Sequence, residues 1–262
     1  MIPQTLEQLR HILPLGSGLN SRISLCALAA SLFIKRRFTI GSRPERLFRL
    51  RYRDRDFACY LADESDLQTL CTVLGREEYA VDLQEEPRII IDLGSNIGLS
   101  LLYFALRYPH ARVYGFEPNP HAFERLQKNI RDFPNVRAFQ LAVSSRDGST
   151  EFYANKKKSI SSSFRVRPGR AEKINVPTRS LPSLLEERKI DRVDILKFDV
   201  EGAEEEIFSA PKALEHIENI IGEVHLPLMS ISKEEFLARF RDFNITLREK
   251  SGDRFILRGR RI

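Results

Sequence analysis

Acidic, basic and imidazole side chains gather in the last third of the chain. Lys197, Asp199 and Glu201 are spaced two apart, Glu204 follows them, and His225 ends a later apolar run. Residues two apart in an extended chain point the same way. A carboxylate, or a histidine that titrates near neutrality, can remove a proton from a hydroxyl group. The spacing therefore predicts an acid–base site built from Lys197, Asp199, Glu201 and His225.

The roles within this cluster follow from chemistry and position. We expect His225 or Asp199 to be the general base, with Glu201 orienting the base or the substrate. Glu204 is expected to be a favourable charge in the first turn of a helix. The expected site holds no metal. The alternative is a divalent cation bound by Asp199, Glu223 and His225, which together offer oxygen and nitrogen ligands.

A glycine-containing turn lies earlier in the chain, between an apolar strand-like run and a helical pattern. Its residues are Asp92, Leu93, Gly94, Ser95, Asn96, Ile97 and Gly98. Gly94 can adopt conformations closed to other residues and lets a ligand approach the main chain. Gly98 is expected to let the helix pack close to the strand. The spacing departs from the dinucleotide fingerprint, so a pyrophosphate would fit less well. Asp92 at the mouth would suit a cationic or neutral ligand.

A second acidic residue, Glu117, closes the next strand-like run and is followed by Pro118 and Asn119. In doubly wound folds an acid at this place binds two ribose hydroxyls. A carboxylate can accept both hydrogen bonds. We therefore expect Glu117 to hold a vicinal diol rather than to be a solvated strand-end charge.

The elements that must position these residues alternate along the chain from residue 88 onward. Apolar runs predict strands over 89–93, 111–116, 136–143, 193–200 and 220–224, with an extra strand over 151–154. Helical spacing predicts helices over 97–108, 120–132, 181–189, 203–216 and 233–243, and segments 245–249 and 254–257 predict a closing hairpin. Strand–helix alternation indicates an α/β fold with a doubly wound, mainly parallel sheet.

Together the glycine turn and Glu117 resemble the S-adenosylmethionine site of class I methyltransferases. The resemblance implies a seven-stranded, Rossmann-like sheet and S-adenosylmethionine as cofactor. By this resemblance, Glu117 holds the ribose, and Gly94 and Asn96 lie along the methionine portion. Ala142 and Val143 lie where that superfamily contacts the adenine. The cofactor-binding residues expected are Asp92, Gly94, Ser95, Asn96, Gly98, Glu117, Pro118, Asn119, Ala142, Val143 and Asp199.

The segment Lys-x-Asp-Val-Glu-Gly-x-Glu, which begins at Lys197, and the later Glu-Val-His ending at His225 resemble the FkbM family. The resemblance covers about residues 66–257, with Asp66 and Glu78-Tyr79 in the lead-in. It implies O-methylation of hydroxyls on sugars, glycans or polyketide-like small molecules. One departure is Ser180-Leu181-Pro182, where the family usually has Thr-Leu-Asp. Ser180 can still cap a helix.

The chain has 262 residues and a formal net charge of +6, which permits one α/β domain and a modest extension. We expect a small helical extension or cap over 1–87 and the methyltransferase domain over 88–262. Three cysteines without metal-ligand spacing fit a reducing compartment, so the expected location is the cytoplasm. The extension and the loop 155–180 are expected to shape the acceptor pocket.

An apolar segment over 23–34, followed by three basic residues, is too short for a transmembrane span. It predicts a helix packed on the domain. The alternative is peripheral membrane contact through residues 19–37. The lysine run 156–158 predicts a solvated loop, or else a flap over the acceptor.

Two other functions compete with hydroxyl methylation. The basic charge and the arginine-rich stretch 43–55 would suit an RNA methyltransferase, but no RNA-binding motif supports a nucleic-acid partner. A non-catalytic nucleotide-binding domain is the other alternative, and the intact glycine turn with Glu117 argues against it. The sequence does not reveal the acceptor's identity or the oligomeric state.

Overall fold

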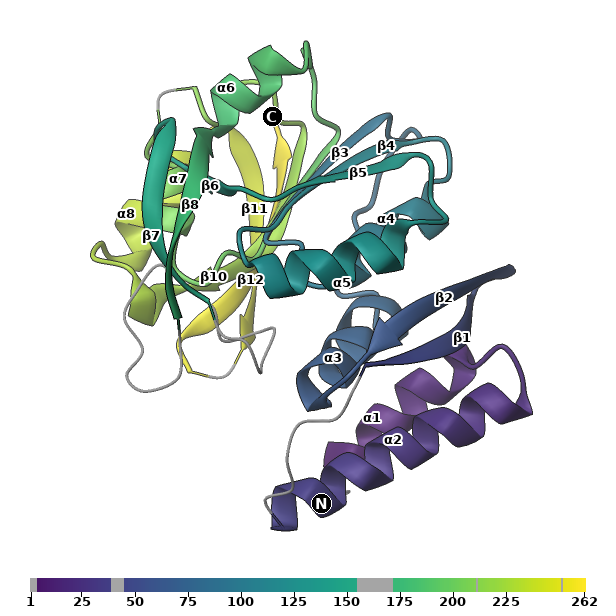
Figure 1. Ribbon diagram of the computed structural model, residues 1–262. Helices are drawn as coiled ribbons and strands as arrows, with labels where there is room; N and C mark the ends of the chain where they lie inside the picture. Colours follow the sequence, from purple (N-terminus) through teal and green to yellow (C-terminus); the bar gives the residue numbers. More distant parts are fainter. Residues whose placement is uncertain (1–3, 39–44, 155–171, 211, 251) are drawn as a thin grey trace.

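A seven-stranded sheet forms the centre of the computed structural model, which describes residues 4–38, 45–154, 172–210, 212–250 and 252–262 (Figure 1). The strand order is β11-β12-β10-β9-β3-β4-β5. These strands are β3 (Ile89–Leu93), β4 (Arg112–Phe116), β5 (Val136–Phe139), β9 (Ile195–Phe198), β10 (Asn219–His225), β11 (Phe243–Lys250) and β12 (Arg254–Arg261). Only the pairings that involve β12 are antiparallel. The predicted doubly wound, mainly parallel sheet is confirmed.

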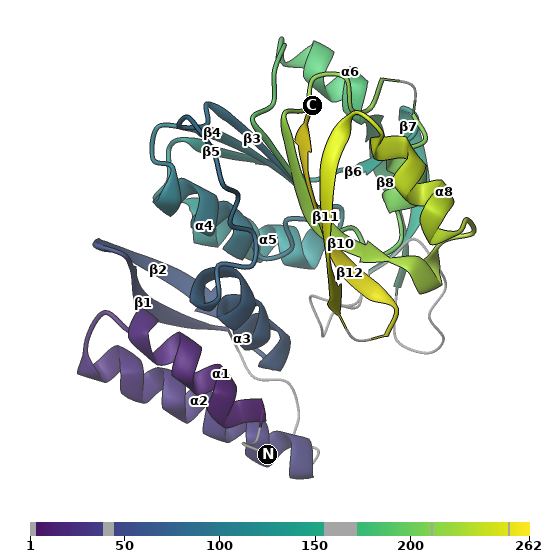
Figure 2. The same ribbon diagram turned by 180° about the vertical axis from the view of Figure 1, so that it is seen from behind.

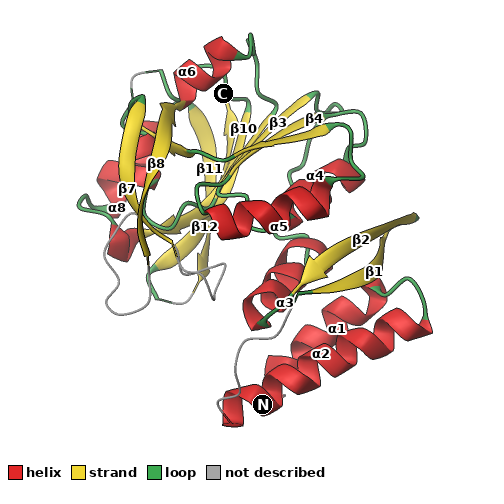
Figure 3. Cartoon of the chain, viewed as in Figure 1, coloured by secondary structure: helices red, strands yellow, loops and turns green. Residues whose placement is uncertain are grey.

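Helices cover both faces of this sheet (Figure 3). They are α4 (Leu99–Arg107) and α5 (Pro120–Ile130) on one face, and α6 (Leu181–Glu187), α7 (Glu204–Ile207) and α8 (Lys233–Leu237) on the other. Because side chains alternate along a strand, Ile90 packs in the first layer while Ile89 and Ile91 pack in the second. Apolar residues at successive positions therefore pack against the helices on both faces of the sheet, as expected for buried parallel strands.

The order of the strands reverses beside β3, which pairs in parallel with β4 on one side and with β9 on the other. The carboxyl ends of these strands consequently meet at one edge of the sheet. Glu117 follows β4, Asp199 follows β9, and His225 ends β10. Ligands of open α/β sheets bind at this kind of reversal. The topology alone thus brings together the acids and the histidine singled out in the sequence.

The strand expected over 136–143 is wrong in its second half. The chain leaves the sheet after β5, and β6 (Ala142–Ser144) instead joins β7 (Gly148–Ala154) and β8 (Glu172–Ser180) in a three-stranded sheet. The extra strand predicted over 151–154 is confirmed as part of β7, whereas β8 was not predicted. At the end of β8, Ser180 Oγ accepts a hydrogen bond from Ser183 N and caps α6, as expected. The lysine run 156–158 lies outside the described residues.

The helix expected over 203–216 is much shorter in the structure. Only α7 is helical, and the described residues after it form turns in which Lys212 has φ +62°. The helix expected over 233–243 is likewise α8 followed by one 3-10 turn, η5 (Ala238–Phe240). The closing hairpin is confirmed as β11 and β12, with longer strands than predicted.

The N-terminal segment is not only helical. Its elements are α1 (Gln4–Ile12), η1 (Leu13–Leu15), α2 (Leu19–Phe38), β1 (Arg46–Tyr52), β2 (Arg55–Leu61), α3 (Glu64–Leu70) and the π-helical η2 (Cys71–Gly75). The expected small helical extension is confirmed in α1, α2 and α3, and the hairpin β1–β2 is an element that was not predicted. None of the helices among the described residues is long and apolar enough to cross a membrane.

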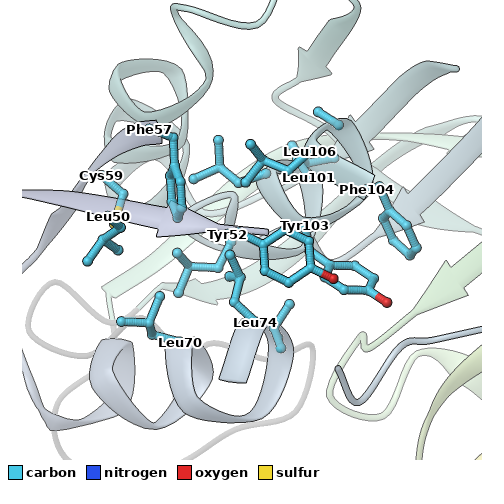
Figure 4. Close-up of a cluster of buried hydrophobic side chains, with 14 of the residues drawn as sticks. Leu50, Tyr52, Phe57, Cys59, Leu70, Leu74, Leu101, Tyr103, Phe104 and Leu106 are labelled. Carbon is cyan, nitrogen blue, oxygen red and sulfur yellow. The ribbon is translucent and has the colours of Figure 1, made fainter. Parts of the chain in front are cut away.

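This N-terminal segment shares one hydrophobic core with α4, and it lies outside α4 and α5 in both views (Figures 1 and 2). Figure 4 shows Tyr52 and Leu74 beside Tyr103 of α4. The rings of Tyr52 and Tyr103 pack edge to face, with their centroids 5.8 Å apart. Asn129 of α5 also joins the layers, because its Oδ1 accepts from Tyr60 N at 2.7 Å. The extension is therefore packed firmly onto the domain, which holds α3 and η2 at the edge where the strands end.

Candidate functional site

The glycine turn after β3 is held against its two neighbouring strands. Gly94 N and Ser95 N both donate to Phe116 O, at 2.9 and 3.1 Å. Gly94 has φ +75°, and a Cβ there would collide with the carbonyl oxygen of Asp199. Asn96, at φ +49°, is a non-glycine residue in the same left-handed region. The turn thus needs glycine at residue 94 because β9 passes directly behind it.

A buried ion pair lies beneath this turn. Lys197 Nζ is 2.7 Å from Asp92 Oδ1, and the two side chains are 2 % and 0 % exposed. The ammonium also donates to Gly94 O at 2.9 Å, while Ser100 Oγ donates to Asp92 Oδ2 at 2.5 Å. A buried charge is tolerated only when it is paired and hydrogen-bonded. These contacts favour a role for Lys197 in fixing the turn; its predicted catalytic role stays a prediction.

Glu117 lies at the end of β4 and bridges the turn to α5. Its Oε2 accepts from Asn96 N at 2.7 Å and its Oε1 accepts from Asn119 N at 2.8 Å. Burial raises the pKa of Glu117 to about 7, although these backbone hydrogen bonds and the charge of Lys197 act in the opposite direction. The carboxylate is buried but lines a pocket, so its remaining lone pairs can accept from a ligand.

His225, at the end of β10, forms a dyad with Glu204 at the start of α7. Its Nδ1 is 2.7 Å from Glu204 Oε1, and Glu204 is fully buried. Burial disfavours the imidazolium ion, but the Glu204 hydrogen bond and the nearby carboxylates outweigh it and raise the pKa of His225 to about 9. With Nδ1 engaged by Glu204, Nε2 is the ring nitrogen that faces the other carboxylates, with Asp199 Oδ1 at 3.9 Å and Glu223 Oε1 at 3.8 Å. The sequence did not predict this pairing.

Asp199 is placed between the histidine and the N-terminal extension. Its Oδ1 is 3.9 Å from His225 Nε2, and its Oδ2 accepts from the hydroxyl of Tyr79 at 3.2 Å. Burial is the main cause that raises the pKa of Tyr79, and the charge of Asp199 adds to it. The phenol therefore stays protonated and donates to Asp199.

Two of the three metal ligands considered from the sequence, Asp199 and His225, belong to a possible metal-binding group in the structure, whereas Glu223 does not. Ligand atoms of Asp199, Glu201 and His225 all lie within 4.8 Å of one another. Glu223 is instead neutralised by Lys250 at 2.6 Å and by Arg254 at 3.0 Å. Glu201 rather than Glu223 is thus the residue that could complete a three-ligand set with Asp199 and His225.

One pocket joins most of the predicted residues. From the predicted cofactor and catalytic residues, those that line it are Gly94, Ser95, Asn96, Glu117, Pro118, Ala142, Val143, Lys197, Asp199, Glu201 and His225. Three predicted residues are not among its lining residues. Asp92 is buried beneath the turn rather than at its mouth, Asn119 Oδ1 accepts from His121 N to cap α5, and Gly98 packs on α5 rather than on the strand.

Several residues that line the pocket were not predicted from the sequence. Thr69 and Thr72 come from α3 and η2, and Lys250 and Arg254 come from the ends of the closing hairpin. These positions are far from the motifs in sequence, so only the fold brings them near. Tyr79 was noted in the lead-in, but its contact with Asp199 carries no sequence signal.

Comparison with known proteins assigns the chain to a family. The model of the methyltransferase FkbM domain matches residues 92–245. The 2-O-methyltransferase NoeI of Sinorhizobium fredii is 29 % identical over 50 % of this chain and 61 % of its own length. The methyltransferase sdnD of Sordaria araneosa is 30 % identical over 60 % of this chain and 74 % of its own. The hexuronic acid methyltransferase AglP of Haloferax volcanii is 29 % identical over 54 % and 57 %.

Among solved structures, fibrillarin of Aeropyrum pernix with bound S-adenosyl-L-methionine aligns with a TM-score of 0.45 at 15 % identity, over 84 % of each chain. The match to NoeI spans less than two thirds of that protein. The family match covers the glycine turn, Glu117, the Lys197–Glu204 segment and His225. The chain belongs to the FkbM family of S-adenosylmethionine-dependent methyltransferases.

Proposed function

We propose that the protein transfers a methyl group from S-adenosylmethionine to a hydroxyl of a sugar, glycan or polyketide-like small molecule. The observation that carries this proposal is the Glu204–His225 dyad, which leaves His225 Nε2 beside Asp199 in the pocket that Glu117 and the glycine turn also line. The similarity to NoeI and AglP, a 2-O-methyltransferase and a hexuronic acid methyltransferase, supports a carbohydrate acceptor.

The residues around the glycine turn fit the cofactor. Asn96 Oδ1 is buried and has no hydrogen-bond partner among the described residues, so it offers an acceptor to a ligand's donor group. The Glu117 carboxylate suits the ribose diol, and Gly94 lines the same pocket, where a ligand can contact the turn. Ala142 and Val143 add apolar surface at the same pocket, where they would contact the adenine.

When bound, the cofactor supplies a methyl group activated on a sulfonium. The protein must align the acceptor oxygen for in-line attack, and alignment of this kind can supply about 7–11 kcal/mol of the barrier. It must also take the hydroxyl proton. In this proposal His225 Nε2 accepts that proton, and Glu204 holds the orientation of the ring through Nδ1. The Glu204 carboxylate then balances the positive charge that the imidazole ring gains.

Asp199 and Glu201 position the acceptor in this proposal. Both line the pocket, and their carboxylate oxygens can accept hydrogen bonds from neighbouring sugar hydroxyls. The hydrogen bond from Tyr79 fixes one oxygen of Asp199 and leaves the other toward His225. The N-terminal extension thereby contributes to the acceptor site through Tyr79.

The test is methyl transfer from labelled cofactor to panels of sugar, lipid-linked glycan, polyketide-like and RNA acceptors. We expect transfer to a hydroxyl of the first three classes. His225→Ala should retain cofactor binding and lose about 10²–10⁴-fold in turnover. His110→Ala, at an exposed position outside the pocket, is the matched control. Undiminished turnover in His225→Ala would refute the base assignment, and transfer to RNA alone would refute the acceptor class.

A further inference from the structure

We propose that α2 and the hairpin β1–β2 form a docking surface for an anionic lipid membrane. The first observation is the distribution of charge along the chain. Residues 1–60 hold eleven Lys and Arg against four Asp and Glu, a net +7, whereas residues 61–262 hold 31 against 32. Residues 1–60 therefore account for the whole positive net charge of the sequence. Anionic surfaces attract such segments.

The second observation is that α2 has two apolar stripes. Leu25, Leu28 and Ala29 are buried in the shared core. Leu19 and Ile23 are 73 % and 56 % exposed. Cys26 and Ala30 continue this outer stripe at helical spacing and are also exposed. A helix that is apolar on both sides normally has a partner on both sides.

Cations occur within α2 and on the strand that passes its start: Arg22 adjoins Ile23 in the helix, and β1 carries Arg46 and Arg49. Ser17 Oγ, just before α2, donates to Arg49 O at 3.1 Å, which places β1 beside the start of the helix. Arg22, Arg46 and Arg49 are exposed, and none forms an ion pair with another described residue. The surface thus combines exposed apolar side chains with uncompensated positive charge.

This combination selects among the occupants that could cover the stripe. A second copy of the chain would bring another segment of net +7 against the first, so self-association is opposed by charge. A nucleic acid would match the charge but would leave Leu19 and Ile23 in water. An anionic bilayer satisfies both, because an interfacial helix buries its apolar stripe while basic residues contact the headgroups.

Vesicle sedimentation of the full chain tests the proposal. We expect the protein to sediment with vesicles of phosphatidylcholine and phosphatidylglycerol, less so at high salt, and not with phosphatidylcholine alone. Leu19→Glu with Ile23→Glu should abolish binding. Arg46→Glu with Arg49→Glu should weaken it at least about tenfold. Because all four side chains are exposed, each double variant should keep the wild-type circular dichroism spectrum and cofactor affinity.

Matched controls separate this surface from general effects. Leu247→Glu places a charge on another exposed apolar side chain, and Arg137→Glu with Arg241→Glu removes the same charge from other exposed positions. Both controls should bind vesicles as the wild type does. Absence of sedimentation, or equal sedimentation of the α2 variant, would overturn the proposal. So would a wild-type dimer that Leu19→Glu with Ile23→Glu dissociates, or binding to RNA without binding to vesicles.

Discussion

Replacing Lys197 with methionine should destabilise the protein strongly. The substitution keeps the length of the side chain but leaves the Asp92 carboxylate, which is 0 % exposed, without its counter-ion 2.7 Å away. Removing one partner of a buried ion pair typically costs about 3–5 kcal/mol. Because Lys197 Nζ also donates to Gly94 O, the same change should loosen the glycine turn and weaken cofactor binding.

Urea unfolding followed by circular dichroism measures this cost, and calorimetric titration measures the cofactor affinity. Lys128→Met is the matched control, because Lys128 is 39 % exposed and pairs with Glu45 at 2.5 Å on the surface. Exposed pairs contribute about 0–1 kcal/mol. Adding Asp92→Asn to Lys197→Met should recover part of the loss, because it removes the uncompensated charge. A loss of unfolding free energy in Lys197→Met no larger than in Lys128→Met would show that the buried ion pair contributes no more than a surface pair.

The remaining predictions concern the pocket. Turnover should rise with pH up to about 9, where His225 Nε2 loses its proton, and Glu204→Gln should move this midpoint down by about one unit in a pH–rate profile. Cofactor affinity should be about tenfold lower one pH unit below 7 than well above pH 7, because Glu117 becomes protonated, and a pH-independent affinity by calorimetry would contradict this role. Gly94→Ala should abolish cofactor binding because its Cβ would collide with the backbone at the end of β9, whereas Gly18→Ala, with open space around it, should not. Turnover should survive exhaustive chelation; a loss that an added divalent cation restores would favour the metal alternative.

Local backbone chemistry made much of the site predictable from sequence. Gly94 follows a buried apolar run, and only a tight strand-to-helix turn explains that order. Glu117 follows the next strand, and the parallel topology puts both at one edge of the sheet. The segment from Lys197 to Glu201 was predictable for the same reason, since it ends a third parallel strand beside the first.

What the sequence did not reveal depends on contacts between distant elements. Glu204 was interpreted as a helix-start charge, because nothing local shows that it meets His225 on another strand. Strand β8 was not predicted because its sequence contains Pro177, a residue that is unusual inside a strand. Its buried side chains are mainly Val176, Thr178 and Ser180, and only the first of these is apolar. The hairpin β1–β2 had a usable signal, since arginines alternate with buried apolar residues along β1 with the period of a strand. The density of charge concealed that pattern.

We propose that the glycine turn and Glu117 together hold the adenosyl cofactor. A crystal structure of the complex with S-adenosylhomocysteine tests it most directly. We expect both ribose hydroxyls to lie within hydrogen-bond distance of the Glu117 carboxylate, and the homocysteine portion to lie along Gly94 and Asn96. A ligand bound elsewhere, or a ribose that makes no contact with Glu117, would contradict it.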